Sequence, residues 1–313
     1  MQYIARRGDD PCPAVPPHAP CFAALAECEF DGNTPMNTRL SLLSMTLLAV
    51  CLSASAQDDK PLIPDKNLEA AVRRSVFEKR DNDKPLTAED LEKISTITGR
   101  GKGIKSLQGL EHCRALAELV LPDNEIGDLS PLKDLKELQT ATLSNNKIKD
   151  LKPLETVTAL QYLELSGNEI ENLAPLEKLS NMRSLYLSKN KVKDLKPVAK
   201  LEKLWSLYLD GNQVSDLKPL AKLPWLSDLD LTGNKVADLA PLKEHDELRH
   251  LILNGNQVKD LGVLLEMAKK DVEGSRRFAP FWNVYLDGNP LSDDAKKQIE
   301  ELKKLGVRIH LKE

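Results

Sequence analysis

The sequence predicts an α/β solenoid, a right-handed horseshoe with a parallel sheet on its concave side, 3₁₀ turns on its convex side and a helical cap at each end. A short motif with a Leu-x-x-Asn core occurs eight times between residues 116 and 291. Its asparagine recurs with a constant 22-residue period from Asn124 to Asn256. The last interval, from Asn256 to Asn289, is 33 residues. A period in the twenties indicates repeats that bury their apolar faces only by stacking on one another.

The strand segment of each repeat alternates apolar and polar residues, as in Leu163-Glu164-Leu165. This alternation is typical of a half-buried strand, with both leucines in the core and Glu164 on the concave face. The asparagine that follows turns the chain, and its amide can bond main-chain groups of its own and neighbouring repeats. We expect the loss of one such amide to cost about 1–3 kcal/mol. The predicted structural ladder is Asn124, Asn146, Asn168, Asn190, Asn212, Asn234, Asn256 and Asn289.

Proline stands at a fixed place on the predicted convex side of six repeats, from Pro131 to Pro241. Proline lacks an N–H donor and interrupts helices, which favours short 3₁₀ turns. A second ladder precedes it: Asp128, Asp150, Asn172, Asp194, Asp216, Asp238 and Asp260. Stacked carboxylates could bind a cation, but the capping of local turns by each side chain is the simpler interpretation.

Two chemically reactive residues fall on a core position that is leucine or valine in most repeats. They are Cys113 and His245, and we expect both to be buried. His250 follows five positions later in a concave strand position, so the two histidines point to opposite sides of the coil and cannot share a metal.

Residues 1–56 differ from the rest of the chain. Residues 1–35 show no helical or strand period, whereas residues 36–56 resemble a secretory signal peptide, with Arg39, an apolar run and Ala54-Ser-Ala56 before Gln57. We therefore expect 1–35 to be a disordered, over-extended N-terminus, 36–56 to be a signal, and the protein to be secreted, periplasmic or on the cell surface. A genuine leader followed by an internal anchor is the alternative, and lipidation at Cys51 is another.

The remaining chain divides into two caps and the repeats between them. Residues 57–104 form the N-terminal helical cap and a degenerate first coil, in which Asp65 and Thr87 are placed as helix N-caps. Residues 105–291 hold eight repeats, and residues 292–313 form a C-terminal cap helix and a final short strand at 307–309.

The last repeat carries an 11-residue insertion. It contains an expected helix at 264–270 and the aromatic residues Phe278, Phe281 and Trp282. We interpret it as an elongated cap that packs these aromatics on the last coil. The alternative is a wall at the end of the concave surface.

Composition argues against several functions. The net charge is −4, which provides no general attraction for nucleic acid or an anionic membrane. The apolar run near residue 45 is shorter than the roughly 20 residues that a membrane span needs. No serine-hydrolase elbow, zinc-protease motif or paired Cys-x-x-Cys is present. Asp228 and Asp230 form a possible carboxylate pair, but an open sheet offers no deep pocket, so we expect no catalytic residue, cofactor or metal.

The concave face is the informative surface. Its central column is Val120, Thr142, Glu164, Tyr186, Tyr208, Asp230, Ile252 and Tyr285, and its flanking columns add Tyr162, Arg183, Trp205, Asp228, Arg249, His250 and Trp282, with Asp210 and Asp287 just beyond. Aromatic and arginine residues among acids are typical of protein-binding hot spots. A solvated sheet with incidental tyrosines is the alternative. The predicted ligand-binding residues are Tyr162, Glu164, Tyr186, Trp205, Tyr208, Asp228, Asp230, His250 and Tyr285.

Together these residues resemble the internalin-type bacterial leucine-rich repeat family. The shared features are the 22-residue period, the Asp-Leu-x-Pro-Leu turn, as in 128–132 and 216–220, and the helical cap that runs into 103–107. The resemblance covers roughly residues 63–291 and implies that the concave face binds a protein. The same period is similar to that of eukaryotic phosphatase-regulating repeat proteins, but the signal peptide argues against a nuclear or cytosolic role.

The sequence thus predicts an exported, non-enzymatic and monomeric module that binds another protein or a peptide on its concave face. Two alternatives remain. A glycan- or peptide-binding receptor could use the same aromatic residues, and a salt-insensitive complex with an oligosaccharide would favour it. A structural envelope component would have no defined ligand and no copurifying partner.

Overall fold

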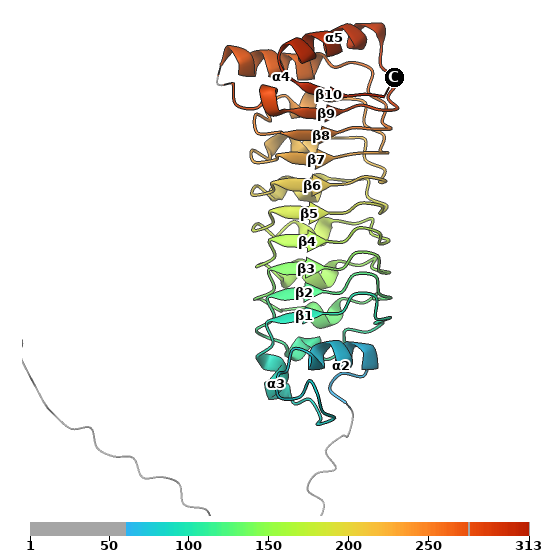
Figure 1. Ribbon diagram of the computed structural model, residues 1–313, viewed down its shortest axis with the longest axis vertical. Helices are drawn as coiled ribbons and strands as arrows, with labels where there is room; N and C mark the ends of the chain where they lie inside the picture. The colour runs from blue at the N-terminus through green and yellow to red at the C-terminus, as the bar shows by residue number, and fades with distance from the viewer. Residues whose placement is uncertain (1–60, 275, 313) are drawn as a thin grey trace, which may run out of the picture. The chain divides into compact units, whose positions relative to one another are not determined.

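The computed structural model describes residues 61–274 and 276–312, so the predicted N-terminal extension and signal peptide lie outside the described residues. The described chain forms one stack of coils whose ten strands make a single parallel sheet, in the order in which they occur in the chain (Figure 1). The strands are β1 (Thr96–Thr98), β2 (Glu118–Val120), β3 (Thr140–Thr142), β4 (Tyr162–Glu164), β5 (Ser184–Tyr186), β6 (Ser206–Tyr208), β7 (Asp228–Asp230), β8 (His250–Ile252), β9 (Asn283–Tyr285) and β10 (Arg308–His310). This is the leucine-rich repeat solenoid that the sequence predicts.

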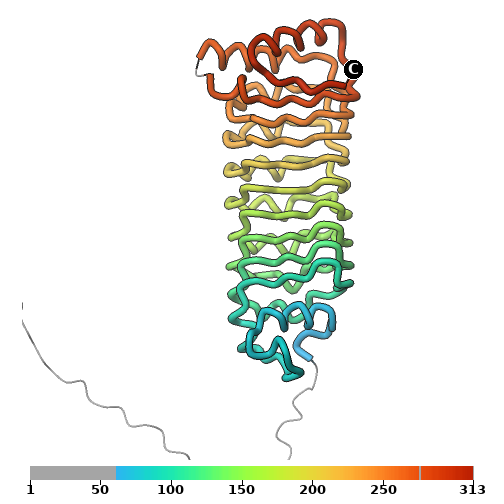
Figure 2. Tube along the Cα trace, in the orientation of Figure 1, coloured from blue at the N-terminus to red at the C-terminus, as the bar shows by residue number. Residues whose placement is uncertain are grey.

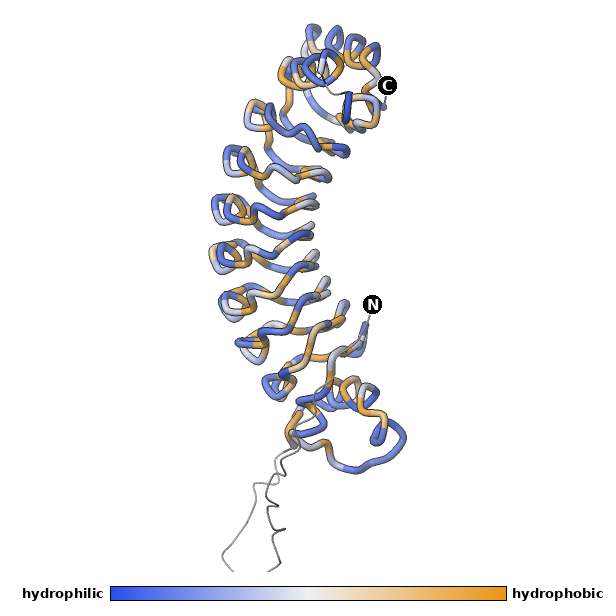
Figure 3. The backbone as a smooth tube through the Cα atoms, turned by 90° about the vertical axis from the view of Figure 1, so that its left-hand side faces the viewer, coloured by the Kyte–Doolittle hydropathy of each residue, from blue (hydrophilic) through white to orange (hydrophobic). Residues whose placement is uncertain are grey.

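The strand register follows the 22-residue period, so equivalent residues of successive repeats lie side by side. Leu163, Leu185, Leu207 and Leu229 are direct neighbours across β4 to β7, and all four are buried. Figure 2 shows each repeat as one coil of the stack. Seen from the side, the coils follow a gently bowed axis with the strands on its inner side (Figure 3). We call this strand-bearing surface the concave face.

The asparagine ladder joins consecutive coils, as Asn212 illustrates. Its Oδ1 accepts a hydrogen bond from the N–H of Val192, in the preceding repeat, at 2.9 Å. Its Nδ2 donates to the carbonyl oxygens of Leu187 and Leu209 at 2.8 and 2.9 Å. All eight predicted asparagines repeat this pattern, so each amide links its own coil to the preceding one.

Short 3₁₀ helices form the convex side of the repeats. They are η1 (Leu110–His112), η2 (Ser130–Leu132), η3 (Lys152–Thr156), η4 (Ala174–Leu176), η5 (Lys196–Lys200), η6 (Lys218–Lys222), η7 (Ala240–Leu242) and, in the insertion, η8 (Ala279–Phe281). A residue of the second ladder caps each of the turns η2 to η7, as when Asp194 Oδ1 accepts from the N–H of Lys196 at 2.9 Å. The other ladder residues, from Asp128 along the stack to Asp260, each accept the equivalent hydrogen bond from the N–H two positions later. These bonds confirm the capping interpretation of this ladder.

The N-terminal cap consists of two short helices, α2 (Lys66–Arg73) and α3 (Ala88–Glu92). Asp65 caps α2 through Oδ1, while its Oδ2 accepts from the N–H groups of Lys105 and Ser106 and so ties the helix to the repeats. Burial raises the pKa of Asp65, but these four main-chain donors outweigh it and hold the pKa below its usual range.

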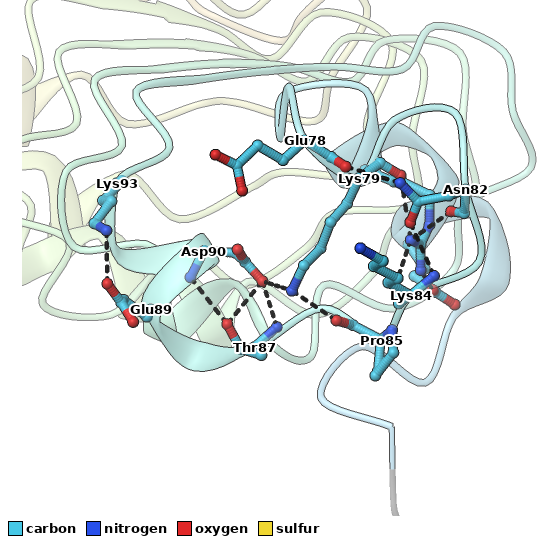
Figure 4. A network of polar contacts seen from close by, with 11 residues as sticks. Glu78, Lys79, Asn82, Lys84, Pro85, Thr87, Glu89, Asp90 and Lys93 are labelled. Carbon is cyan, nitrogen blue, oxygen red and sulfur yellow. Dashed lines mark hydrogen bonds and ion pairs between the residues drawn. The ribbon is translucent and has the colours of Figure 1, made fainter.

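A polar network holds the loop between these helices (Figure 4). Thr87 and Asp90 form a capping box, and Lys79 Nζ donates to Asp90 Oδ2 at 2.5 Å and to the carbonyl oxygen of Pro85 at 2.8 Å. Desolvation opposes ionisation of Asp90, yet the Lys79 and Thr87 donors lower its pKa to about 2. The network is therefore a structural clamp on the cap.

The C-terminal cap contains α4 (Gly262–Glu273) and α5 (Asp293–Lys304), which pack together. Ser292 caps α5 as predicted, and the final strand lies one position later than expected. The insertion buries Phe278 and Trp282, whose rings meet edge to face at 5.1 Å, but leaves Phe281 57% exposed. The placement of Trp282 in the exposed flanking column was therefore wrong. In regular repeats the equivalent of Phe281 is buried and that of Trp282 is exposed, as with Leu248 and Arg249, whereas in the last repeat, where η8 leads into β9, this order is reversed.

Candidate functional site

The strand register brings most of the predicted binding residues together on β4 to β8. One column runs Glu164, Tyr186, Tyr208 and Asp230. The neighbouring column, two positions earlier on each strand, runs Tyr162, Ser184, Ser206, Asp228 and His250. We call these two columns, with Trp205 beside them, the central patch.

Three tyrosines of the central patch contact one another. The ring centroids of Tyr162 and Tyr186 are 5.2 Å apart and tilted, and those of Tyr186 and Tyr208 are 4.8 Å apart with planes at 14°. Each tyrosine is half-buried, and desolvation raises its pKa above the ordinary value. The stack is therefore a neutral group of packed aromatic rings that carries phenolic hydrogen-bonding groups.

Acidic residues border the stack on the side of β7. Asp228 Oδ1 lies 2.6 Å from Nδ1 of His250, on the next strand. Asp230 accepts from the N–H of Thr232 at 2.9 Å, and burial raises its pKa. The two carboxylates flank Leu229 and have different partners, so they form an acidic edge with two distinct environments.

A second aromatic feature lies where the strands begin. Trp205, immediately before β6, and Trp225, three positions before β7, line one shallow groove together with Arg183, Ser184 and Lys203. Trp225 was not predicted from the sequence, because it lies three positions before β7, outside the columns that flank the strands. The signal was present, since the equivalent residues of other repeats are Glu137, Ala159, Asn181, Lys203 and Glu247.

Tyr285 lies apart from the central patch. It is on β9, and Asp230 and Ile252 separate it from Tyr208 in the same column. Its ring stacks on His310 of β10, with centroids 4.1 Å apart and planes at 9°. Tyr285 and His310 thus form a separate feature beside the C-terminal cap.

The reactive side chains away from the concave face are in the core. Cys113 is buried, and desolvation raises the pKa of its thiol to about 12, which suppresses the nucleophilic thiolate. His245 is buried on the opposite side of the coil from His250, with its two ring nitrogens 3.2 and 3.1 Å from the carbonyl oxygens of Leu242 and Leu220. Both environments are those expected of the predicted core position.

Residues 61–274 and 276–312 contain no group of three His, Cys, Asp or Glu side chains that could hold a metal ion. In the same part of the chain, no helix has the length and apolar character needed to cross a membrane. The central patch itself offers ring stacking, charge and hydrogen-bonding groups.

Comparisons with known proteins agree with this architecture. Residues 136–178, 158–203 and 203–244 match the family model described as leucine rich repeats (2 copies). The structure of internalin C2 from Listeria monocytogenes strain 4b F2365 is 33% identical, with a TM-score of 0.52, and the match covers 62% of this chain and 95% of that chain. A leucine-rich repeat protein of Leptospira interrogans, 22% identical with a TM-score of 0.52 over 66% of this chain and 57% of that chain, shares the fold. A comparison with curated proteins finds no match.

Proposed function

Because the chain is an internalin-like leucine-rich repeat protein, we propose that it is a non-enzymatic module that binds another protein or an extended peptide on its concave face. The observation that carries the proposal is the stack of Tyr162, Tyr186 and Tyr208 beside the acidic edge of Asp228 and Asp230. Half-buried aromatic rings bordered by charge are typical of the residues that dominate binding energy at interfaces.

The dimensions of the central patch suit a protein loop or an extended peptide. It spans the five strands from β4 to β8, and neighbouring strands lie about 4.8 Å apart, so it is roughly 20 Å long. An extended peptide of about six residues covers that length, at about 3.3 Å per residue. Alternate side chains of such a peptide can contact the tyrosines and the acidic edge.

A crosslinking and pull-down experiment tests the proposal. The full chain and a Tyr186→Ala/Tyr208→Ala variant serve as baits, and a Lys191→Ala/Lys193→Ala variant, altered at exposed residues outside the central patch, is the control. We expect a protein partner to be retained by the wild type and the lysine control and to be lost from the tyrosine variant. Retention by the tyrosine variant together with loss from the lysine control would show that the binding face is not the concave one.

The same aromatic surface supports a second candidate function, the binding of a glycan. A sugar ring could pack against the stacked rings of Tyr186 and Tyr208 and form hydrogen bonds with their phenolic hydroxyls. A complex with an oligosaccharide that persists at high salt and is lost in Tyr186→Ala would support this function over protein binding.

We further propose that the protein is exported through a signal at residues 36–56 and acts as a monomer. Ala54-Ser-Ala56 before Gln57 supports cleavage at that point. Sequencing of the exported protein should begin at Gln57, and mature protein that begins at Met1 would refute both the signal and the interpretation of residues 1–35 as an over-extended N-terminus. Light scattering of the mature protein should give the mass of one chain.

A further inference from the structure

Two of the chain's three tryptophans stand in solvent at the edge of the sheet where the strands begin. Trp205 is 45% exposed and Trp225 is 55% exposed, whereas the third, Trp282, is buried. The exposed pair lies in adjacent repeats and lines one groove. Large apolar side chains gathered on a surface are typical of a site that a partner covers.

The groove also holds positive charge that no acid neutralises. Within the described residues, the Arg183 guanidinium makes no hydrogen bond or ion pair, and Lys203 Nζ donates to the neutral amide oxygen of Asn181 at 2.8 Å. Several exposed lysines elsewhere pair with a carboxylate of the preceding repeat, as Lys147 does with Glu125 at 2.7 Å and Lys191 with Glu169 at 3.1 Å. The two cations of the groove are therefore available to an anionic group from outside the chain.

We propose that the groove formed by Arg183, Ser184, Lys203, Trp205 and Trp225 binds an acidic segment of the partner protein. In that segment an apolar side chain adjoins an Asp or Glu carboxylate. The apolar side chain packs against the two indoles, while the carboxylate accepts two parallel hydrogen bonds from Arg183 and pairs with Lys203. This assignment rests on the proposed function, to which it adds the chemistry of the partner.

The charges around the groove also set the direction of the segment. Ser227 is the neighbour of Trp205 in the next repeat. Asp228 follows Ser227 directly, and Asp230 lies two positions further along the same strand. A partner carboxylate is attracted at the Arg183 edge and repelled at this acidic edge, so the acidic residue lies where the strands begin. A neutral sugar ring could stack on the indoles but would leave both cations unpaired, which is why an acidic protein segment fits better.

Selection from a peptide library tests the assignment even while the partner is unidentified. A displayed library of random peptides is panned on the full-length protein and, in parallel, on the Arg183→Gln/Lys203→Gln variant. We expect the wild type to enrich sequences in which Asp or Glu adjoins Trp, Phe or Leu, and the variant not to enrich them. Enrichment of neutral or basic sequences, of the same acidic sequences on both proteins, or of none would overturn the inference.

Fluorescence then locates the binding of the selected peptide, because the two exposed tryptophans line the groove. Saturating peptide should shift the emission to shorter wavelength. Arg183→Gln should weaken binding about tenfold, the loss typical of a hot-spot residue. Arg114→Gln, at an exposed arginine outside the groove, is the matched control and should bind as the wild type does. Equal binding of a peptide with Asn and Gln in place of Asp and Glu would overturn the charge pairing.

Three further results separate the possible failures. Tighter binding of polygalacturonate, which has carboxylates but no apolar side chains, would assign the groove to an acidic glycan and overturn the peptide assignment. A protein partner that depends on Tyr186 and Tyr208 but not on Arg183 and Lys203 would overturn this inference and leave the proposed function intact. A partner that depends on none of these four residues would overturn both.

Discussion

Gly109 and Leu62 are packed so closely that a Cβ atom on Gly109 would lie 2.4 Å from the carbonyl oxygen of Leu62. Gly109 also has a φ of +103°, a backbone conformation that side chains disfavour. The glycine precedes η1, and Leu62 belongs to the segment that enters the N-terminal cap. This contact is therefore a point at which the cap seals the open end of the repeat stack.

Replacement of Gly109 by Ala should loosen that seal. We expect a loss of about 1–3 kcal/mol of unfolding free energy, from backbone strain and from the displaced Leu62 carbonyl. Urea denaturation measures the loss. Gly101→Ala is the matched control, because Gly101 also has a positive φ, of +62°, but a Cβ there meets nothing within 4 Å. Equal losses in the two variants would show that strain alone, and not the Leu62 contact, matters.

Replacement of Asn212 by Ala should destabilise the middle of the stack. It leaves the N–H of Val192 and the carbonyl oxygens of Leu187 and Leu209 without their side-chain partner, at a cost of about 1–3 kcal/mol. Thermal unfolding measures the cost, and Asn181→Ala, which removes a more exposed amide, is the control. A melting temperature unchanged in Asn212→Ala would contradict the structural role of the ladder.

These two sites differ in how far the sequence foretells them. The role of Asn212 follows from its 22-residue recurrence. A fixed period places every asparagine in one column, where the groups within reach of each amide are main-chain N–H and C=O groups. The contact between Gly109 and Leu62 does not follow, because it joins the non-repetitive cap to the first coil. The repeat period therefore makes the core and the turns predictable, whereas contacts in the non-repetitive caps cannot be predicted from it.

The same distinction explains which parts of the candidate site could be predicted from the sequence. The columns that hold Tyr186, Tyr208 and Asp228 come directly from the period, and so does the juxtaposition of Asp228 and His250, one period apart. Trp282 was misplaced because, after the 11-residue insertion, Phe281 is exposed and Trp282 is buried, the reverse of the equivalent positions in regular repeats. Trp225 was not predicted, although its counterparts in other repeats, four of the five polar, mark it as unusual.

The buried His245 should make stability depend on pH. Burial lowers the pKa of this histidine below its ordinary value of 6.5, while hydrogen bonds to Leu242 and Leu220 oppose the shift. The unfolded chain therefore takes up the proton more readily than the folded chain does. Burial of the neutral histidine contributes its full stability above pH 6.5. This contribution is lost as the pH falls from 6.5 through the lowered pKa of the folded state. His245→Leu should consequently lose less stability than the wild type between about pH 7 and pH 5.

Leucine suits this position, since Leu201 and Leu223 occupy it in other repeats. The carbonyl oxygens of Leu242 and Leu220 also accept main-chain N–H groups at 3.0 Å, so the substitution leaves neither without a partner. Melting temperatures across the pH range provide the measurement, with His112→Gln as the control. Parallel pH profiles for the wild type and His245→Leu would exclude His245 as the origin of the dependence.

The stacked tyrosines should contribute to binding as a coupled pair. Once a partner is identified, Tyr186→Ala and Tyr208→Ala should each weaken binding by about 1–3 kcal/mol. Because the two rings lie 4.8 Å apart, the loss of one removes part of the surface that orders the other, and the double variant should depart from additivity by about 0.5 kcal/mol or more. Calorimetry of the single and double variants measures the difference.

Tyr285, which stacks on His310 instead, is the matched control, and Tyr285→Ala should combine additively with Tyr186→Ala. Additive losses for Tyr186 and Tyr208 would mean that the partner contacts two independent rings rather than one ordered surface.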